Sequence, residues 1–148
     1  MPANRDFKEL FCAFNEENVE YLVVGAHAYI FYAEPRYTKD LDIWVNPTEA
    51  NARRVLRALA KFGAPLADVS PADLTNPEMV LQIGVEPNRF DILMGITGVD
   101  FEPAWTNRSP STYDGIPINI LGKVDLIRNK RACGRPKDMI DIERLEKD

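Results

Sequence analysis

The most constraining feature of this sequence is a pair of aspartates at the head of a strongly apolar segment. Asp40 and Asp42 flank Leu41, and the apolar run continues through Ile43 to Val45. Residues two apart on a β-strand point to the same face, so both carboxylates can face a cleft while Leu41 and Ile43 face a core. The strand rise places the two aspartate Cα atoms about 6.5–7 Å apart, which lets their side chains converge on a metal ion. Without metal the carboxylates repel each other, and one tends to stay protonated.

A third aspartate lies inside a later apolar segment. Asp91 stands between Phe90 and Ile92, in a stretch that is typical of a strand and in which a lone aspartate is unfavourable. If this strand lies beside residues 41–45, Asp91 joins the first pair. Three hard oxygen ligands suit magnesium, which proteins usually hold with few carboxylates together with waters and substrate phosphates. Each signal is weak alone, because Asp-x-Asp also marks solvated strand edges, and it is their order along the chain that favours a metal site.

The hydrophobic pattern predicts a mixed sheet with helices around it. Strands are expected at residues 21–24, 41–45, 79–85, 89–94 and 116–121, with a turn at residues 86–88. Helices are expected at residues 6–15, 26–33, 48–62, 101–107 and 123–132, and from Pro136 onward. Residues 64–77 are expected to form a loop or a short helical turn. The predicted fold class is therefore α/β (α+β), in a single domain spanning residues 1–148.

The same pattern predicts which side chains are buried. The aromatic residues expected in the core are Tyr29, Phe31, Tyr32 and Trp44. The side chains of the last helix that can face inward are Met139, Ile140, Ile142 and Leu145. The helix at residues 48–62 also carries a basic surface, which is usually a solvated face but could touch an RNA backbone. Its members are Arg53, Arg54, Arg57 and Lys61.

Composition limits the class of function. The net charge of -5 does not suggest a general nucleic-acid binder, because phosphate binding usually appears as a basic surplus. Cys12 and Cys133 lie far apart, outside any metal-ligand spacing, and are expected to be free thiols in a reducing compartment. The first ten residues contain no apolar signal core, and the longest apolar stretch, residues 21–33, is too short to span a bilayer. These observations predict a cytoplasmic protein with no membrane partner.

Two segments resemble the signature of the nucleotidyltransferase superfamily. They are Val-Val-Gly-Ala-His-Ala at residues 23–28 and Arg-Tyr-Thr-Lys-Asp-Leu-Asp-Ile-Trp-Val at residues 36–45. In that signature a strand ends in Gly-Gly or Gly-Ser, a helix follows, and an Asp-x-Asp strand comes next; Asp91 matches the third carboxylate, on a later strand. The tail, residues 125–138, resembles the C-terminal helix pair of the small uncharacterised and AbiEii-type toxin branches. The resemblance covers about residues 21–145.

The resemblance implies a nucleotidyltransferase-like mixed sheet flanked by helices and the transfer of a nucleoside monophosphate from an NTP, such as ATP, to a hydroxyl acceptor. Two Mg²⁺ or Mn²⁺ ions about 3.5–4 Å apart would bridge the triphosphate and the attacking hydroxyl, and pyrophosphate would leave. Asp40 and Asp42 would ligate both ions. Asp91 would ligate the catalytic ion and could help deprotonate the acceptor. The acceptor could be RNA, protein or a small molecule, and a toxin-like enzyme would have an antitoxin-like partner protein.

Five further residues are candidates for nucleotide binding. The backbone N–H groups of Gly25 and Ala26 could cradle phosphate at a helix start. Ala26 departs from the Gly-Gly or Gly-Ser pattern, so a serine hydroxyl contact is lost. Arg36 and Lys39 precede the acidic pair and could bind triphosphate, and in the resembled branch a lysine at the place of Lys130 approaches the nucleotide. The alternative interpretation is that these cations are simply solvated.

Three classes of function stay open at this point. The leading hypothesis is a metal-dependent nucleotidyltransferase. The second is a catalytically weak nucleotide-binding or interaction protein of a toxin–antitoxin pair, which the alanine at position 26 keeps in play. The third is a structural domain in which the aspartates merely cap strand edges. Metal-dependent triphosphate binding separates the third from the other two, and label transfer separates the first from the second.

Overall fold

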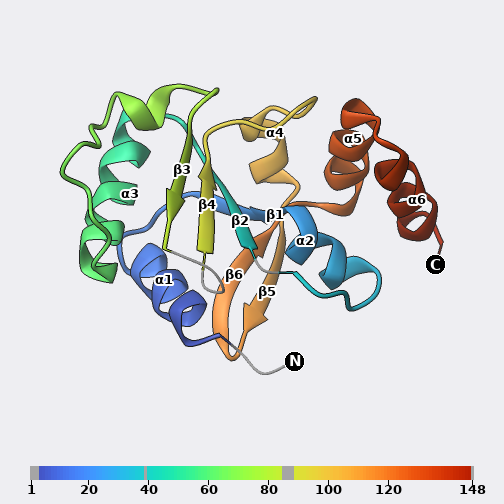
Figure 1. The fold of residues 1–148 in the computed structure, drawn as a ribbon, viewed down its shortest axis with the longest axis horizontal. Coiled ribbons are helices and arrows are strands. Elements are labelled where there is room, and N and C mark those ends of the chain that lie inside the picture. The colour runs from blue at the N-terminus through green and yellow to red at the C-terminus, as the bar shows by residue number, and fades with distance from the viewer. Residues whose placement is uncertain (1–3, 39, 85–88, 148) are drawn as a thin grey trace.

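Helices and strands alternate along most of the chain (Figure 1). The computed structural model describes residues 4–38, 40–84 and 89–147. The helices are α1 (Arg5–Glu16), α2 (Gly25–Tyr32), α3 (Glu49–Phe62), α4 (Phe101–Thr106), α5 (Lys123–Cys133) and α6 (Pro136–Leu145), with a 3-10 turn η1 (Asp73–Thr75). The strands are β1 (Tyr21–Val24), β2 (Asp40–Val45), β3 (Val80–Ile83), β4 (Arg89–Leu93), β5 (Ser109–Tyr113) and β6 (Ile116–Ile120).

The six strands form one mixed sheet in the order β3-β4-β2-β1-β6-β5. The pairs β2–β4 and β1–β6 are parallel, whereas β1–β2, β3–β4 and β5–β6 are antiparallel. All four residues of β1 are buried, as expected for an apolar strand near the centre of a covered sheet. The predicted α/β fold with a mixed sheet is therefore confirmed, and the adjacency of β2 and β4 is the part of it that matters for the site.

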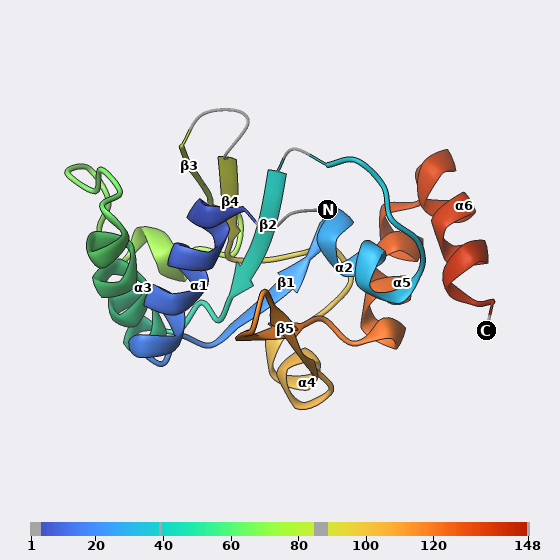
Figure 2. The same cartoon turned by 90° about the horizontal axis from the view of Figure 1, so that it is seen from below.

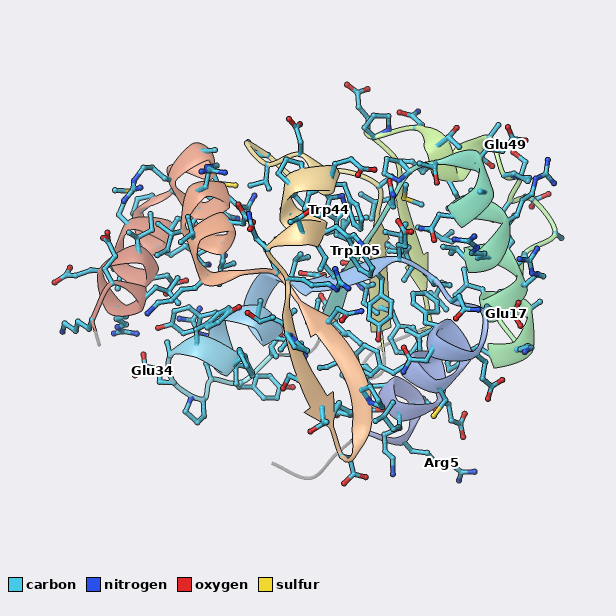
Figure 3. The ribbon with its side chains drawn as sticks, turned by 180° about the vertical axis from the view of Figure 1, so that it is seen from behind. Arg5, Glu17, Glu34, Trp44, Glu49 and Trp105 are labelled. Carbon is cyan, nitrogen blue, oxygen red and sulfur yellow. The ribbon has the colours of Figure 1, made fainter. Side chains whose placement is uncertain are left out.

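The two faces of the sheet are covered by different helices. On one face, Phe90 of β4 packs against Phe7 of α1 and Phe62 of α3, with ring centroids 5.4 and 5.3 Å apart. On the other face, Trp44 of β2 meets Phe101 of α4 edge to face at 5.0 Å, and Figure 3 shows Trp44 beside this helix, which also carries Trp105. Helices α1 and α3 lie together at one end of the molecule, and α5 and α6 at the other (Figure 2). Asp40 and Asp42 therefore share the face of Trp44, away from α1 and α3.

The structure differs from the sequence-based expectations at β5. This strand pairs with β6 from Ser109 to Tyr113, and no strand was predicted there. Its sequence, Ser-Pro-Ser-Thr-Tyr, has little apolar character, and Pro110 cannot donate a backbone hydrogen bond. Both features are tolerated because β5 lies at the edge of the sheet.

Two expectations about burial were wrong. Phe31 is 45% exposed, since it lies near the end of α2, whereas Tyr29 and Trp44 are buried as predicted. In α6, Met139 and Ile140 are half exposed, although Ile142 and Leu145 are buried. The reason for the α6 result is that two carboxylates, Asp138 and Asp141, occupy inward positions of that helix. The apolar periodicity assigns aspartates to the solvent-exposed face of a helix. The prediction therefore placed Met139 and Ile140 on the buried face instead of Asp138 and Asp141.

Cys12 and Cys133 are exposed free thiols, as predicted. No helix in the described part of the chain is both long enough and apolar enough to cross a membrane. Lys39 and the turn at residues 86–88 lie outside the described residues.

Candidate active site

Strand pairing brings the three candidate aspartates, Asp40, Asp42 and Asp91, to one face of the sheet. In the parallel pair β2–β4, Asp42 lies directly opposite Asp91, and Asp40 lies opposite Arg89. Leu41, between the first two aspartates, is 1% exposed and faces the core, so the alternation expected for this strand holds. Residues opposite each other in neighbouring strands share a face, and the site is therefore an acidic cluster drawn from two strands.

A glycine turn places the end of β1 against this cluster. Val24 pairs with Asp42 in the antiparallel β1–β2 ladder, and Gly25 follows with φ +64°, in the left-handed region that favours glycine. A Cβ atom at position 25 would collide with the carboxylate of Asp42. Gly25 is therefore required both by its backbone conformation and by the closeness of the acidic side chain.

The first turn of α2 begins at this glycine. In the described structure no side chain caps the start of the helix, so the backbone N–H groups around Gly25 and Ala26 are left for another acceptor. Helix N-termini favour anions, because these N–H groups and the helix dipole act together. The predicted phosphate cradle at Gly25 and Ala26 thus has the right backbone beside the acidic cluster, and its role in binding stays a prediction.

The electrostatics of the cluster are dominated by Asp42. Burial, followed by the charges of Asp91 and Asp40 and a hydrogen bond with Asp91, raises the pKa of Asp42 to about 7, and Arg89 offsets this only in part. Near neutral pH the protein therefore binds a proton on a group that is normally ionised. A bound cation would relieve the same repulsion.

Arg89 is the site residue that sequence reasoning missed. Its Nη2 lies 3.3 Å from Asp40 Oδ2, and its Nε lies 3.5 Å from Asp91 Oδ1. The signal was present in the sequence, because Arg89 and Asp91 are two apart on a strand and must share a face. What could not be read locally was that this face would also carry Asp40.

The cluster fits a divalent cation by the kind of donor it offers. Asp40 Oδ1 and Asp91 Oδ1 are buried and have no hydrogen-bond partner among the described residues. Buried carboxylate oxygens without partners are costly, and hard oxygen donors suit Mg²⁺ or Mn²⁺. As the side chains stand, however, no three His, Cys, Asp or Glu residues in the described part of the chain are placed to hold one ion. Backbone positions and donor type fit a cation, and the side chains must rearrange to bind it.

The predicted phosphate ligands Arg36 and Lys130 both contact Asp141 of α6. Arg36 contacts the two oxygens of Asp141 at 3.2 and 2.7 Å, and Lys130 Nζ lies 3.0 Å from the same carboxylate. The guanidinium of Arg36 also stacks on the ring of Tyr29, 3.7 Å from its centre. Although burial opposes it, Arg36 and Lys130 lower the pKa of Asp141. The nucleotide-binding role of these two cations stays a prediction.

Comparison with solved structures identifies the fold. The chain has the fold of nucleotidyltransferases. The lincosamide antibiotic adenylyltransferase LnuA, solved with lincomycin bound, aligns with a TM-score of 0.60 over 97% of this chain and 96% of its own, at 16% identity. A nucleotidyltransferase candidate from Thermotoga maritima, TM1012, aligns with a TM-score of 0.65 over 94% of this chain and 89% of its own, at 15% identity. No protein-family profile matches the sequence, and no significant match was found among curated proteins.

Proposed function

We propose that this protein is a metal-dependent nucleotidyltransferase that moves a nucleoside monophosphate from an NTP to a hydroxyl acceptor. The observation that carries the proposal is the register of β2 and β4, which sets Asp42 opposite Asp91 with Asp40 on the same face. The turn at Gly25 adds a helix start packed against Asp42. The shared fold agrees with this chemistry, and the site residues supply the argument for it.

Each part of the site has a role in the proposed reaction. Asp40, Asp42 and Asp91 would hold Mg²⁺ or Mn²⁺, which when bound would stabilise charge on the attacking and leaving oxygens. The backbone at Gly25 and Ala26 binds phosphate oxygens. The acceptor oxygen forms a bond to the α-phosphorus, the bond from that phosphorus to the bridging oxygen breaks, and pyrophosphate leaves with the electron pair. Asp91 takes the proton of the acceptor hydroxyl.

The charges of α3 favour an acceptor other than a long RNA backbone. Arg53 pairs with Glu49 at 2.9 Å, Arg57 pairs with Glu17 at 3.0 Å, and Lys61 pairs with Glu16 at 3.3 Å and also with Glu17. Figure 3 shows Glu17 beside α3. The basic surface predicted for this helix is thus largely neutralised. A small molecule or a protein hydroxyl agrees better with this surface, and LnuA acts on a small-molecule antibiotic.

Label transfer tests the proposal directly. Purified protein would be incubated with Mg²⁺ or Mn²⁺, each of the four α-labelled NTPs, and three acceptor pools: total RNA, total protein and a hydroxyl-bearing small-molecule library. We expect transfer to at least one pool, and loss of transfer in Asp42→Asn. An exposed aspartate in a loop, Asp68, provides the matched control, and Asp68→Asn should transfer normally. Absence of transfer from every NTP to every pool would contradict the enzyme.

A nucleotide-binding protein without transfer is the second candidate. It is favoured by Ala26, which lacks the hydroxyl of the resembled signature, and by the need for side-chain rearrangement before a cation is held. Calorimetry with a non-hydrolysable triphosphate analogue separates the candidates. Metal-dependent binding that disappears in Asp42→Asn, without label transfer, would support the binding protein. The AbiEii-type assignment and the antitoxin-like partner belong to either candidate as predictions.

A further inference from the structure

Arg89 introduces a positive charge into the cluster where a cation is proposed to bind. It lies opposite Asp40 across the β2–β4 ladder and two residues before Asp91 on its own strand. Its side chain is 31% exposed, and those of Asp40 and Asp91 are 32% and 15% exposed. The guanidinium therefore faces the acidic cluster from within a largely covered site, where charge interactions are stronger than in open water.

The contacts of Arg89 are long for charge-assisted hydrogen bonds, which usually lie near 2.7–2.9 Å. Arg89 Nη2 donates to Asp40 Oδ2 at 3.3 Å. Arg89 Nε lies 3.5 Å from Asp91 Oδ1 and makes no hydrogen bond within the part of the chain that the structure describes. One oxygen of Asp40 is also left without a partner among the described residues. Arg89 therefore offsets part of the negative charge of the cluster without hydrogen-bonding to all of its buried carboxylate oxygens. Another cation could replace a counter-ion held in this way.

We propose that Arg89 is a displaceable counter-ion that competes with a divalent cation for Asp40 and Asp91. This inference rests on the proposed metal-dependent function. Arginine cannot lose its proton in a protein, so its positive charge must move away before a divalent ion binds the same oxygens. The wild-type protein alone then binds the cation weakly. Arg89 acts as a positioning residue, since it sets when the carboxylates are available.

Direct measurement of Mn²⁺ binding tests this role without any turnover. Electron paramagnetic resonance of free Mn²⁺ would be recorded for wild-type protein, Arg89→Gln and Arg89→Lys, with no nucleotide present. Because the competing guanidinium is then absent, we expect Arg89→Gln to bind Mn²⁺ about 10-fold or more tightly than wild type, which corresponds to about 1.4 kcal/mol or more. Arg89→Lys keeps the charge and should stay close to wild type. Arg53→Gln removes an arginine of a surface ion pair and should change nothing.

The outcomes separate this inference from the proposed function. Equal or weaker Mn²⁺ binding by Arg89→Gln, with binding that is lost in Asp42→Asn, would overturn the role of Arg89 and leave the metal site standing. Absence of Mn²⁺ binding in every variant, or binding that Asp42→Asn does not affect, would overturn both. Thermal melting of each variant in EDTA shows whether it is folded. If Arg89→Gln is unfolded without metal, melting with added Mn²⁺ decides: recovery of the fold supports competition, and failure to recover contradicts it.

Discussion

At the scale of single residues, the fold changes the chemistry of Asp42 strongly. Its usual pKa is 3.8, and the folded protein raises that pKa to about 7. In the window between these values the folded chain holds a proton that the unfolded chain has released. Raising the pH through this window therefore lowers the free energy of unfolding of the metal-free protein. The loss is complete above the folded-state pKa of about 7.

Replacing Asp42 by Asn should remove this penalty. One pKa unit corresponds to about 1.4 kcal/mol, and because Asp42 is only partly buried we expect Asp42→Asn to stabilise the metal-free protein by about 1–3 kcal/mol near pH 8. The gain should shrink as the pH falls towards 4 and vanish below it, where the aspartate is protonated in both the folded and the unfolded states. Urea unfolding in EDTA across this range measures the difference, with Asp68→Asn as the control. A gain that does not depend on pH would show that charge is not its cause.

Gly25 gives a second prediction at this scale. Alanine at position 25 must adopt a left-handed conformation, which costs about 1–2 kcal/mol, and its Cβ must displace the carboxylate of Asp42. We expect Gly25→Ala to lose more stability than this and to lose metal-dependent triphosphate binding. Gly134 is the matched control, since its φ of +66° is nearly the same and the nearest atom to an added Cβ is 3.7 Å away. Equal effects of the two substitutions on stability and binding would argue against a tight Gly25–Asp42 contact.

At the scale of elements, a buried charge network joins α5 and α6 to the segment before β2. Lys130 of α5 is 9% exposed and lies 3.0 Å from Asp141 of α6, and Asp141 in turn holds Arg36, which precedes β2. Asp138, on the same helix, pairs with Arg135 at 2.7 Å. Buried charges need partners, so these interactions fix how the terminal helices dock.

Removing Lys130 should therefore weaken the fold. Loss of one partner from a buried pair commonly costs 3–5 kcal/mol, and because Arg36 still faces Asp141 we expect Lys130→Met to cost about 2–4 kcal/mol. Lys137→Met, at an exposed position of α6, should stay within about 0.5 kcal/mol of wild type. Urea unfolding measures both variants. If Lys130→Met is as stable as wild type but binds triphosphate poorly, the lysine acts on the nucleotide, as the sequence resemblance implies.

At the scale of the whole molecule, binding at the acidic cluster should stabilise the entire fold, because the proposed ligand would contact β2, β4 and the start of α2 together. A ligand at 100 times its Kd stabilises the folded state by about 2.7 kcal/mol. For a chain of this size that corresponds to a rise in Tm of about 5–10 °C. We expect this rise with Mg²⁺ plus a non-hydrolysable NTP analogue in wild type, and none in Asp42→Asn. An equal rise in both proteins would place the ligand elsewhere.

Much of this molecule was predictable from its sequence, because the patterns involved are local. Alternation along residues 41–45 determined that Asp40 and Asp42 share a face, and apolar periodicity located most helices and strands. The edge strand β5 escaped prediction because its residues carry no apolar alternation. The inward turn of Asp138 and Asp141 escaped because a buried charge is recognisable only once its partner is known.

The site itself was decided only by the tertiary structure. Asp91 and Arg89 are separated from Asp40 and Asp42 by about 50 residues, and nothing local determines that β4 pairs with β2 in parallel and in this register. The parallel pairing and its register depend on the path by which α3 and the loop after it connect β2 to the later strands. They also depend on which hydrophobic faces of the strands and helices can be buried together. The sequence by itself supplied three carboxylates and a glycine turn; long-range strand pairing brought them together and added the arginine that balances their charge.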